Sequence, residues 1–236
     1  MPKIPRLKIL DETDVLKIHE TSLRILNEVG CKFYHDEALR ILDEAGASVD
    51  YSQALAKFPE ELVSEAVRRS PSRFQVTARN PKYDLAVGDG NVYFTNGFGA
   101  INILDTALNK VRPATLKDLE DFTLICDALE HVHWIIPQCI PQDTPKEVCD
   151  RFIAFAMFKN SSKHLSLYPF SLEGLKDIIR MAAITLGGEE ELRKKPTIIG
   201  STLHSSSPLQ YRRDTIDFLT LLSKYRTTIS IGVGPI

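Results

Sequence analysis

The sequence predicts an α/β fold in which about four strand–helix units form part of a (β/α)8 barrel, preceded by a helical segment and a β-meander. The first observation is spacing. Strand-like apolar runs recur about every 30 residues, the length that a strand, a crossover helix and two short loops require. The second is alternation, because segments with helical periodicity and capping residues lie between these runs. Strands that alternate with capped helices indicate a parallel sheet with right-handed crossovers.

The expected boundaries divide the chain into three parts. They are an N-terminal helical segment over 1–72, a β-meander over 73–114 and the first half of a (β/α)8 barrel over 115–236. Four parallel strands cannot close a barrel alone, so we expect one exposed edge. A doubly wound sheet is the other open solution.

In the first part, apolar periodicity predicts three short helices, over 13–29, 36–45 and 59–69. Thr13 is suited to cap the first helix, and Pro59 lies near the start of the third. Gly30 and Gly46 stand where a left-handed residue ends a helix, and Ser70-Pro71 ends the third.

The middle part combines short β-prone runs with turn residues. Residues 74–78 alternate with period two, and three further strand-like runs follow at 92–94, 101–104 and 110–112. Asp89-Gly90 and Asn96-Gly97 favour tight hairpin turns because those turns need positive φ. We therefore expect a β-meander.

The third part carries the repeated units. Its strand-like runs are 133–137, 164–168, 197–203 and 228–231. Each helix between or before them has a start signal: Thr115 with Asp118, Thr144-Pro145-Lys146-Glu147, Ser171, and Ser207-Pro208-Leu209-Gln210. Gly187-Gly188 ends the helix that Ser171 begins.

Composition narrows the possible functions. The chain has 236 residues, 43% of them hydrophobic, and a formal charge of −2. Near-neutral charge argues against a nucleic-acid or anionic-membrane surface. No apolar stretch is long enough to span a bilayer, and the N-terminus lacks the apolar core of a secretory signal. The four cysteines are widely spaced, so we expect a cytoplasmic chain with reduced thiols.

The short motifs favour structural interpretations. Gly97-Phe98-Gly99 lacks the third glycine of a dinucleotide loop and precedes a strand. Gly232-Val233-Gly234 follows a strand, but no helix is visible after it. His131-Val132-His133 has no third ligand nearby, so we expect no metal site. P-loop and nucleophile-elbow signatures are absent from the sequence.

Polar and aromatic side chains follow the strand-like runs. In a barrel, binding residues lie at the carboxyl ends of the strands. This predicts a substrate site built from Gln138, Tyr168, Phe170 and His204. Asn96 and Phe98 lie at the tip of an expected turn, and we expect them to lie over the same end of the barrel, which we call its mouth.

Three stretches of the chain resemble the trimethylamine–corrinoid methyltransferase family. They are Ile18-His19 through Gly30; Phe94 through Ala100, followed by Asp105, Arg112-Pro113-Ala114-Thr115 and Asp118-Leu119; and Ser206-Ser207-Pro208-Leu209 leading to Ile229 through Pro235. Family members are roughly double this length and look like (β/α)8 barrels. The resemblance implies that this chain is similar to their N-terminal half.

The resemblance also implies the chemistry. It implies transfer of a methyl group from a methylated amine, such as trimethylamine or a betaine, to the Co(I) of a partner corrinoid protein. The corrinoid belongs to the partner, so no cofactor is expected to bind this chain directly, and the family does not rely on zinc. Some members use pyrrolysine at a position outside the matching half, so the sequence leaves the subgroup open.

A methylated ammonium suits an aromatic cage, because each ring face attracts a cation by about 0.5–2 kcal/mol. Tyr168, Phe170 and Phe98 are the expected cage, and His204 with Gln138 is expected to orient a carboxylate or polar tail. No catalytic residue is assigned.

Two alternatives stay open. In the first alternative, the chain is a truncated or split-gene fragment without independent activity, which a second half or a homo-oligomer completes. In the second, it is an amine-binding module that retains the pocket and does not carry out the methyl transfer.

Overall fold

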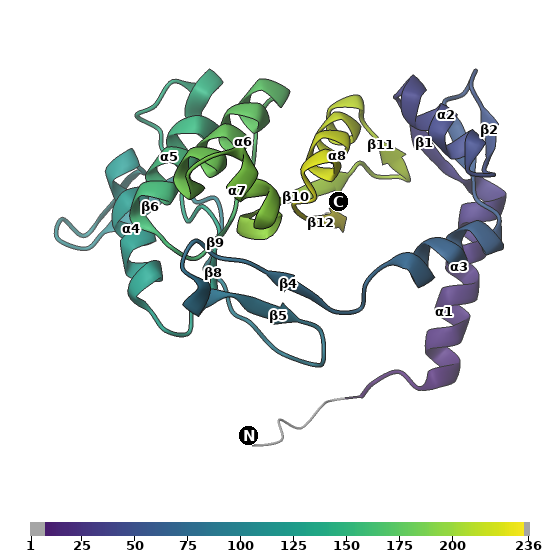
Figure 1. The fold of residues 1–236 in the computed structure, drawn as a ribbon, viewed down its shortest axis with the longest axis horizontal. Coiled ribbons are helices and arrows are strands. Elements are labelled where there is room, and N and C mark those ends of the chain that lie inside the picture. The colour runs from purple at the N-terminus through teal and green to yellow at the C-terminus, as the bar shows by residue number, and fades with distance from the viewer. Residues whose placement is uncertain (1–7, 234–236) are drawn as a thin grey trace. The chain divides into compact units, whose positions relative to one another are not determined.

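The computed structural model describes residues 8–233, and the chain divides into two compact units (Figure 1). The described part of the first unit comprises 8–71 and 205–213. The second comprises 72–204 and 214–233. No helix among the described residues is long and apolar enough to cross a membrane.

The first unit contains the three predicted helices and a small sheet. The helices are α1 (Glu12–Arg24), continued by a π-helical turn (Ile25–Val29), α2 (Asp36–Glu44) and α3 (Glu60–Arg69). The strands are β1 (Cys31–Phe33), β2 (Ser48–Asp50), β3 (Leu55–Lys57) and β11 (Gln210–Tyr211), in the order β11-β1-β3-β2. These strands were not predicted, because two or three residues are too few to show a period.

The ends of the first helices follow local chemistry. Asp11, not the predicted Thr13, caps α1, and it forms a capping box with Asp14. The prediction was wrong by two residues because aspartate competes equally well for this position. Gly30 and Gly46 both have positive φ, +78° and +100°, but Gly30 has ψ −170° and so lies outside the predicted left-handed helical region.

The second unit is built on a four-stranded sheet in the order β12-β10-β9-β8. Its strands are β8 (Trp134–Ile135), β9 (His164–Ser166), β10 (Ile199–Ser205) and β12 (Thr228–Val233). β9 pairs in parallel with both β8 and β10, so the predicted parallel sense is confirmed for these three strands. Neighbouring strands follow one another in the sequence, without the reversal of order that defines a doubly wound sheet.

Helices cover one face of this sheet. They are α4 (Leu116–Ala128), α5 (Cys149–Asn160), α6 (Leu172–Leu186), α7 (Glu189–Lys194) and α8 (Arg213–Tyr225). Strand residues Ile135, Leu165 and Ile199 are buried in one apolar core with the inward faces of the helices. The structure therefore has a mixed α/β architecture with parallel sheet segments.

Two separate hairpins replace the predicted β-meander. β4 (Phe74–Val76) pairs with β5 (Leu85–Val87), and β6 (Asn102–Asp105) pairs with β7 (Lys110–Pro113), each as its own two-stranded sheet. The segment between the hairpins bonds instead to the chain at and after β8, through Phe94 O with His133 N and Ala100 N with Gln138 O. Its backbone groups are taken by a partner distant in sequence, which turn residues alone do not reveal.

Two of the four helix starts predicted for residues 115–236 are confirmed. Thr115 and Asp118 form a capping box for α4, and Ser171 accepts from Gly174 N at the start of α6. The Thr144 box is wrong, because a 3₁₀ turn at Lys146–Val148 precedes α5 and no side chain caps it. The Ser207 box is also wrong. Ser206 and Gln210 exchange backbone hydrogen bonds of 2.7 and 2.9 Å, so this stretch is a turn, and α8 begins at Arg213.

A buried lysine closes the C-terminal end of α4. Lys163 is 2% exposed, and its Nζ donates to the carbonyls of Cys126, Leu129 and Val132 at 2.6–2.9 Å. These carbonyls lie at and beyond the helix end, where a cation is favoured by the helix dipole. Burial lowers the pKa of Lys163, while the three acceptors satisfy its donors.

Candidate functional site

Two of the predicted site residues meet beyond the carboxyl ends of β8 and β9. The rings of Phe98 and Tyr168 lie with centroids 4.2 Å apart and planes tilted by 34°. Phe98 is 50% exposed and Tyr168 is half-buried, so a ring surface remains open to solvent. Residues 70 positions apart in sequence thus form one aromatic surface, which we call the Phe98–Tyr168 pair.

Asn96 holds the segment that carries Phe98. Its Nδ2 donates to the Ile136 carbonyl at 2.7 Å, and its Oδ1 accepts from Ile136 N at 3.2 Å. Gly99 N donates to the Pro137 carbonyl at 3.0 Å. The side-chain amide of Asn96 is therefore bonded to the backbone just after β8, and it fixes the turn that carries Phe98.

Phe170 follows Tyr168 on the loop between β9 and α6. Its side chain is 50% exposed, and its backbone N donates to Asp150 Oδ2 at 2.8 Å. The loop therefore places two aromatic residues at this end of the sheet.

Gln138 does not join the Phe98–Tyr168 pair. Its Nε2 donates to Cys126 Sγ of α4 at 3.4 Å, so the side chain extends toward the helical layer. Its buried Oε1 has no hydrogen-bond partner among the described residues.

His204 lies near the end of β10 beside β12. A Cβ placed on Gly232 would lie 3.2 Å from two atoms of the imidazole, so the glycine makes room for this ring. His204 is exposed. Of the Gly232-Val233-Gly234 motif, Gly232 and Val233 belong to β12, and Gly234 lies outside the described residues.

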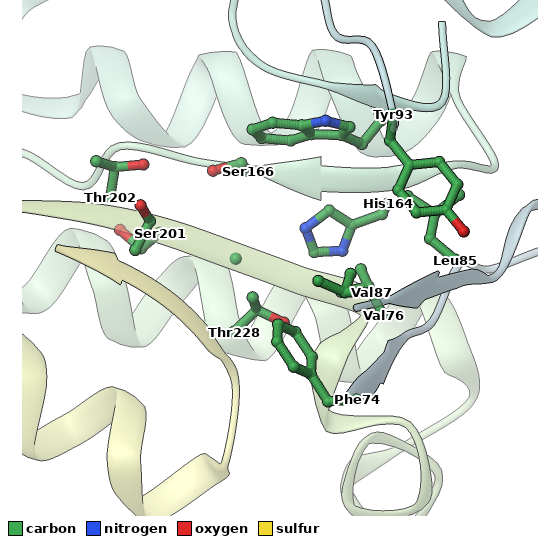
Figure 2. Close-up of a pocket in the computed structure, with 13 residues that line it drawn as sticks. Phe74, Val76, Leu85, Val87, Tyr93, His164, Ser166, Ser201, Thr202 and Thr228 are labelled. Atoms are coloured by element: carbon green, nitrogen blue, oxygen red, sulfur yellow. The ribbon is translucent and has the colours of Figure 1, made fainter. Parts of the chain in front are cut away.

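Sequence reasoning missed a cavity of about 280 Å3 on the sheet face opposite the helices (Figure 2). The sheet side of its lining is Trp134, His164, Ser166, Gly200, Ser201, Thr202, Thr228 and Ser230, and the other wall is Phe74, Val76, Leu85, Val87 and Tyr93. No Asp, Glu, Lys or Arg side chain is among them. The sequence did carry a signal for this cavity. Small or polar residues occupy many of the strand positions that face it, whereas barrel interiors usually hold bulky aliphatic residues there.

His164 is a neutral imidazole within this cavity wall. Burial lowers its pKa to about 4, and Nδ1 lies 2.8 Å from the Thr197 carbonyl. A carbonyl only accepts, so Nδ1 carries the proton and Nε2 is the acceptor. Nε2 faces Gly200, because a Cβ there would lie 3.0 Å from it.

An ion-pair network explains part of the motif that carried the family resemblance. Arg112 bonds Asp105 Oδ2 at 3.0 Å and spans both oxygens of Asp118 at 2.7 and 2.9 Å. Arg112 lowers the pKa values of both carboxyl groups. The network joins the β6–β7 hairpin to the first turn of α4, so these residues have a structural role.

The cysteines and the possible metal ligands are two further features of the described residues. All four cysteines are free and buried, and burial raises the pKa of Cys139 to about 11. Cys139 is thus a thiol rather than a thiolate at neutral pH. Within 8–233, no three His, Cys, Asp or Glu side chains are grouped to hold a metal ion.

The chain is similar to known amine methyltransferases. The family model described as trimethylamine methyltransferase (MTTB) matches residues 1–231. A trimethylamine methyltransferase of Desulfitobacterium hafniense is 32% identical over 156 residues, covering 66% of this chain and 31% of that protein. A glycine betaine methyltransferase of the same species is 31% identical over 209 residues, covering 88% of this chain and 43% of that protein. A trimethylamine methyltransferase of Methanosarcina mazei is 29% identical over 163 residues. The chain spans less than half the length of these relatives.

Proposed function

The chain belongs to the trimethylamine methyltransferase (MTTB) family, and from this premise we propose that it is part of an enzyme that demethylates a methylated amine. The donor is a tertiary or quaternary amine such as trimethylamine or a betaine, and the acceptor is the Co(I) of a partner corrinoid protein. The corrinoid is a substrate brought by that partner.

The Phe98–Tyr168 pair is the observation that carries the proposal. Two aromatic faces without an adjacent bound cation are the surface that a methylated ammonium prefers, and each face contributes about 0.5–2 kcal/mol. Phe170, two residues after Tyr168, supplies a third ring. In this proposal His204 contacts a carboxylate or polar tail. Gln138 acts through its backbone carbonyl. This oxygen accepts from Ala100 N at 3.1 Å and so holds the segment that carries Phe98.

The reaction requires a positively charged nitrogen. The C–N bond breaks with its electron pair staying on nitrogen, so the ammonium leaves as a neutral amine. Co(I) supplies the pair of the new Co–C bond and becomes Co(III), and the methyl group moves as CH3+. The chain's own contribution is to hold the N–CH3 bond in line and keep water away, which can supply up to about 7–11 kcal/mol.

We further propose that the β12-β10-β9-β8 sheet is part of a (β/α)8 barrel. The sequential strand order supports this, since barrel strands follow one another around the cylinder. The small and polar face of the sheet then lines the barrel interior, and the Phe98–Tyr168 pair lies at the rim where barrel enzymes bind substrates.

Calorimetric titration of the purified chain with trimethylammonium and with glycine betaine tests the binding step. Replacing Tyr168 or Phe98 by Ala should weaken binding about tenfold, the loss of roughly 1.4 kcal/mol of cation–π attraction. Phe155→Ala is the matched control, because Phe155 is a 58% exposed aromatic residue of α5 that lines a different groove. Equal affinity of wild type and both site variants would contradict the proposal.

A second assay separates binding from catalysis. The chain is mixed with trimethylamine or glycine betaine and a reduced corrinoid protein, and methyl–cobalt formation is followed by absorbance. Since the chain covers 43% of its glycine betaine methyltransferase relative, amine binding without transfer would favour the amine-binding module, or a fragment that needs a complementing half.

A further inference from the structure

Asp150, the second residue of α5, is a buried carboxylate with no part in the sequence predictions. The residue is 1% exposed. Its Oδ1 accepts from Arg151 N at 2.9 Å and lies 3.4 Å from Arg151 Nη1. Its Oδ2 accepts from Phe170 N at 2.8 Å. A buried charge is retained only when it is well paired, so these bonds indicate a specific task.

The task of Oδ2 is to tether the loop between β9 and α6. At one end of this loop Leu167 N donates to the Gly200 carbonyl at 2.8 Å, and at the other Ser171 caps α6. The Phe170 bond fixes the loop between these two points. Tyr168 lies within this stretch, and its ring lies against that of Phe98 with the planes tilted by 34°.

Gly174 gives independent evidence that the carboxylate is built into this place. A Cβ on Gly174 would overlap Asp150 Oδ2, and it would lie 3.2 Å from Ser171 Oγ. Any larger residue at position 174 would therefore push the carboxylate away. Gly174 has no unusual backbone conformation, so its role here is to leave room for the side chain of Asp150 from α5.

Arg151 balances the charge from outside the loop. Its Nε bonds Asp177 Oδ2 at 2.7 Å, and its Nη1 also donates to the Glu147 carbonyl at 3.2 Å. Asp177 lies one turn further along α6 and pairs with Arg180. The carboxylate also lies at the N-terminal turn of α6, where the helix dipole favours an anion.

We propose that Asp150 is a positioning residue that sets Tyr168 against Phe98 and so shapes the amine-binding surface. This inference rests on the proposed function. Asp150 touches no reacting atom. It acts through the Phe170 N–H, and its effect is on amine affinity.

The experiment changes this tether in two ways. Asp150→Asn keeps the volume but turns one acceptor oxygen into a donor, which must face either Phe170 N–H or Arg151 N–H. Replacing the Phe170 amide by an ester, with phenyllactic acid incorporated at position 170, removes only the donor and leaves the charge of Asp150 paired. Asp177→Asn is the matched control, because it disturbs Arg151 on the same helices without touching the Phe170 bond.

Two readouts are compared. NMR of the tyrosine-labelled chain reports the ring-current shift that Phe98 exerts on Tyr168, assigned with Tyr168→Phe. Calorimetry with tetramethylammonium reports affinity. Both tether variants should move the Tyr168 signals toward those of Phe98→Ala and weaken binding about tenfold, while Asp177→Asn leaves both readouts unchanged.

The outcomes separate the two proposals. Folded tether variants with unchanged Tyr168 signals would overturn the positioning role. The ester variant answers the question even if Asp150→Asn does not fold. If the wild-type chain binds no methylated ammonium, the proposed function itself fails, and the Asp150 proposal that rests on it fails with it.

Discussion

At the scale of single residues, His164 couples stability to pH. Burial lowers its pKa from 6.5 to about 4 in the folded chain. Between these values the unfolded chain binds a proton that the folded chain does not. The free energy of unfolding therefore falls as pH falls from about 6.5 to 4, by up to about 3 kcal/mol. Above pH 6.5 this contribution is fully present.

Urea unfolding followed by circular dichroism from pH 7.5 to 4.5 measures this coupling. We expect the wild-type midpoint to fall with pH, and His164→Asn to show a flatter dependence because asparagine keeps a donor for Thr197 but does not titrate. The exposed His131→Asn should behave as wild type. Identical pH dependence in wild type and His164→Asn would contradict the linkage.

At the scale of elements, two helix-ending glycines differ in their surroundings. Both have positive φ, which costs an L-residue about 1–2 kcal/mol. A Cβ at Gly46 meets nothing within 4 Å, whereas one at Gly30 would overlap the Ala56 carbonyl oxygen and lie 2.9 Å from Lys57 Cγ. Gly30 thus allows the close approach of β3 to the end of the first helix.

Gly30→Ala should destabilise the first unit by at least about 1 kcal/mol more than Gly46→Ala, since only Gly30→Ala adds overlap to backbone strain. Amide hydrogen exchange of β1 and β3 measures the local stability. Equal protection in the two variants would show that β3 moves away without cost.

At the scale of the whole molecule, the first unit is assembled from two distant stretches of chain. β11 pairs in parallel with β1, and Phe33 stacks on Tyr211 with centroids 5.0 Å apart. Lys32 N and Tyr34 N donate to the carbonyls of Leu209 and Tyr211. These contacts do not depend on the covalent link between Pro71 and Ser72.

A protease recognition sequence inserted between Pro71 and Ser72 tests this assembly. After cleavage the two pieces should co-elute in size exclusion, because the β1–β11 pairing and the ring stack remain. Tyr211→Ala should let them separate, while Tyr51→Ala, which alters an exposed tyrosine of the same unit, should not. Separation of the cleaved wild-type pieces would show that these contacts are too weak to hold the unit together.

Sequence reasoning succeeded where the deciding bonds are local. Thr115 caps α4 through Asp118, and Ser171 caps α6 through Gly174, each across three residues. The juxtaposition of Phe98 and Tyr168 also agrees with the expected mouth, because parallel strands bring their carboxyl ends to one edge. The roles of the site residues stay predictions.

It failed where distant groups compete for the same backbone or space. The meander was wrong because residues 94–100 bond to 133–140, and the Ser207 box was wrong because β11 belongs to another sheet. The bond from the side chain of Gln138 to Cys126 of α4 was not expected, and the role of Gln138 in a substrate site stays a prediction. Asp150 gave no signal, since a carboxylate in a helix is ordinary until its burial is known.

The amino-acid sequence by itself determined the family, the alternation of strands and helices, and most helix ends, because periodicity and capping act within a few residues. Only the tertiary structure decided which segments pair, which face of the sheet holds the neutral His164 cavity, and that Asp150 tethers the aromatic loop. Those features depend on burial and on contacts between residues far apart in the chain. Such burial and contacts contribute to stability only once the chain is folded.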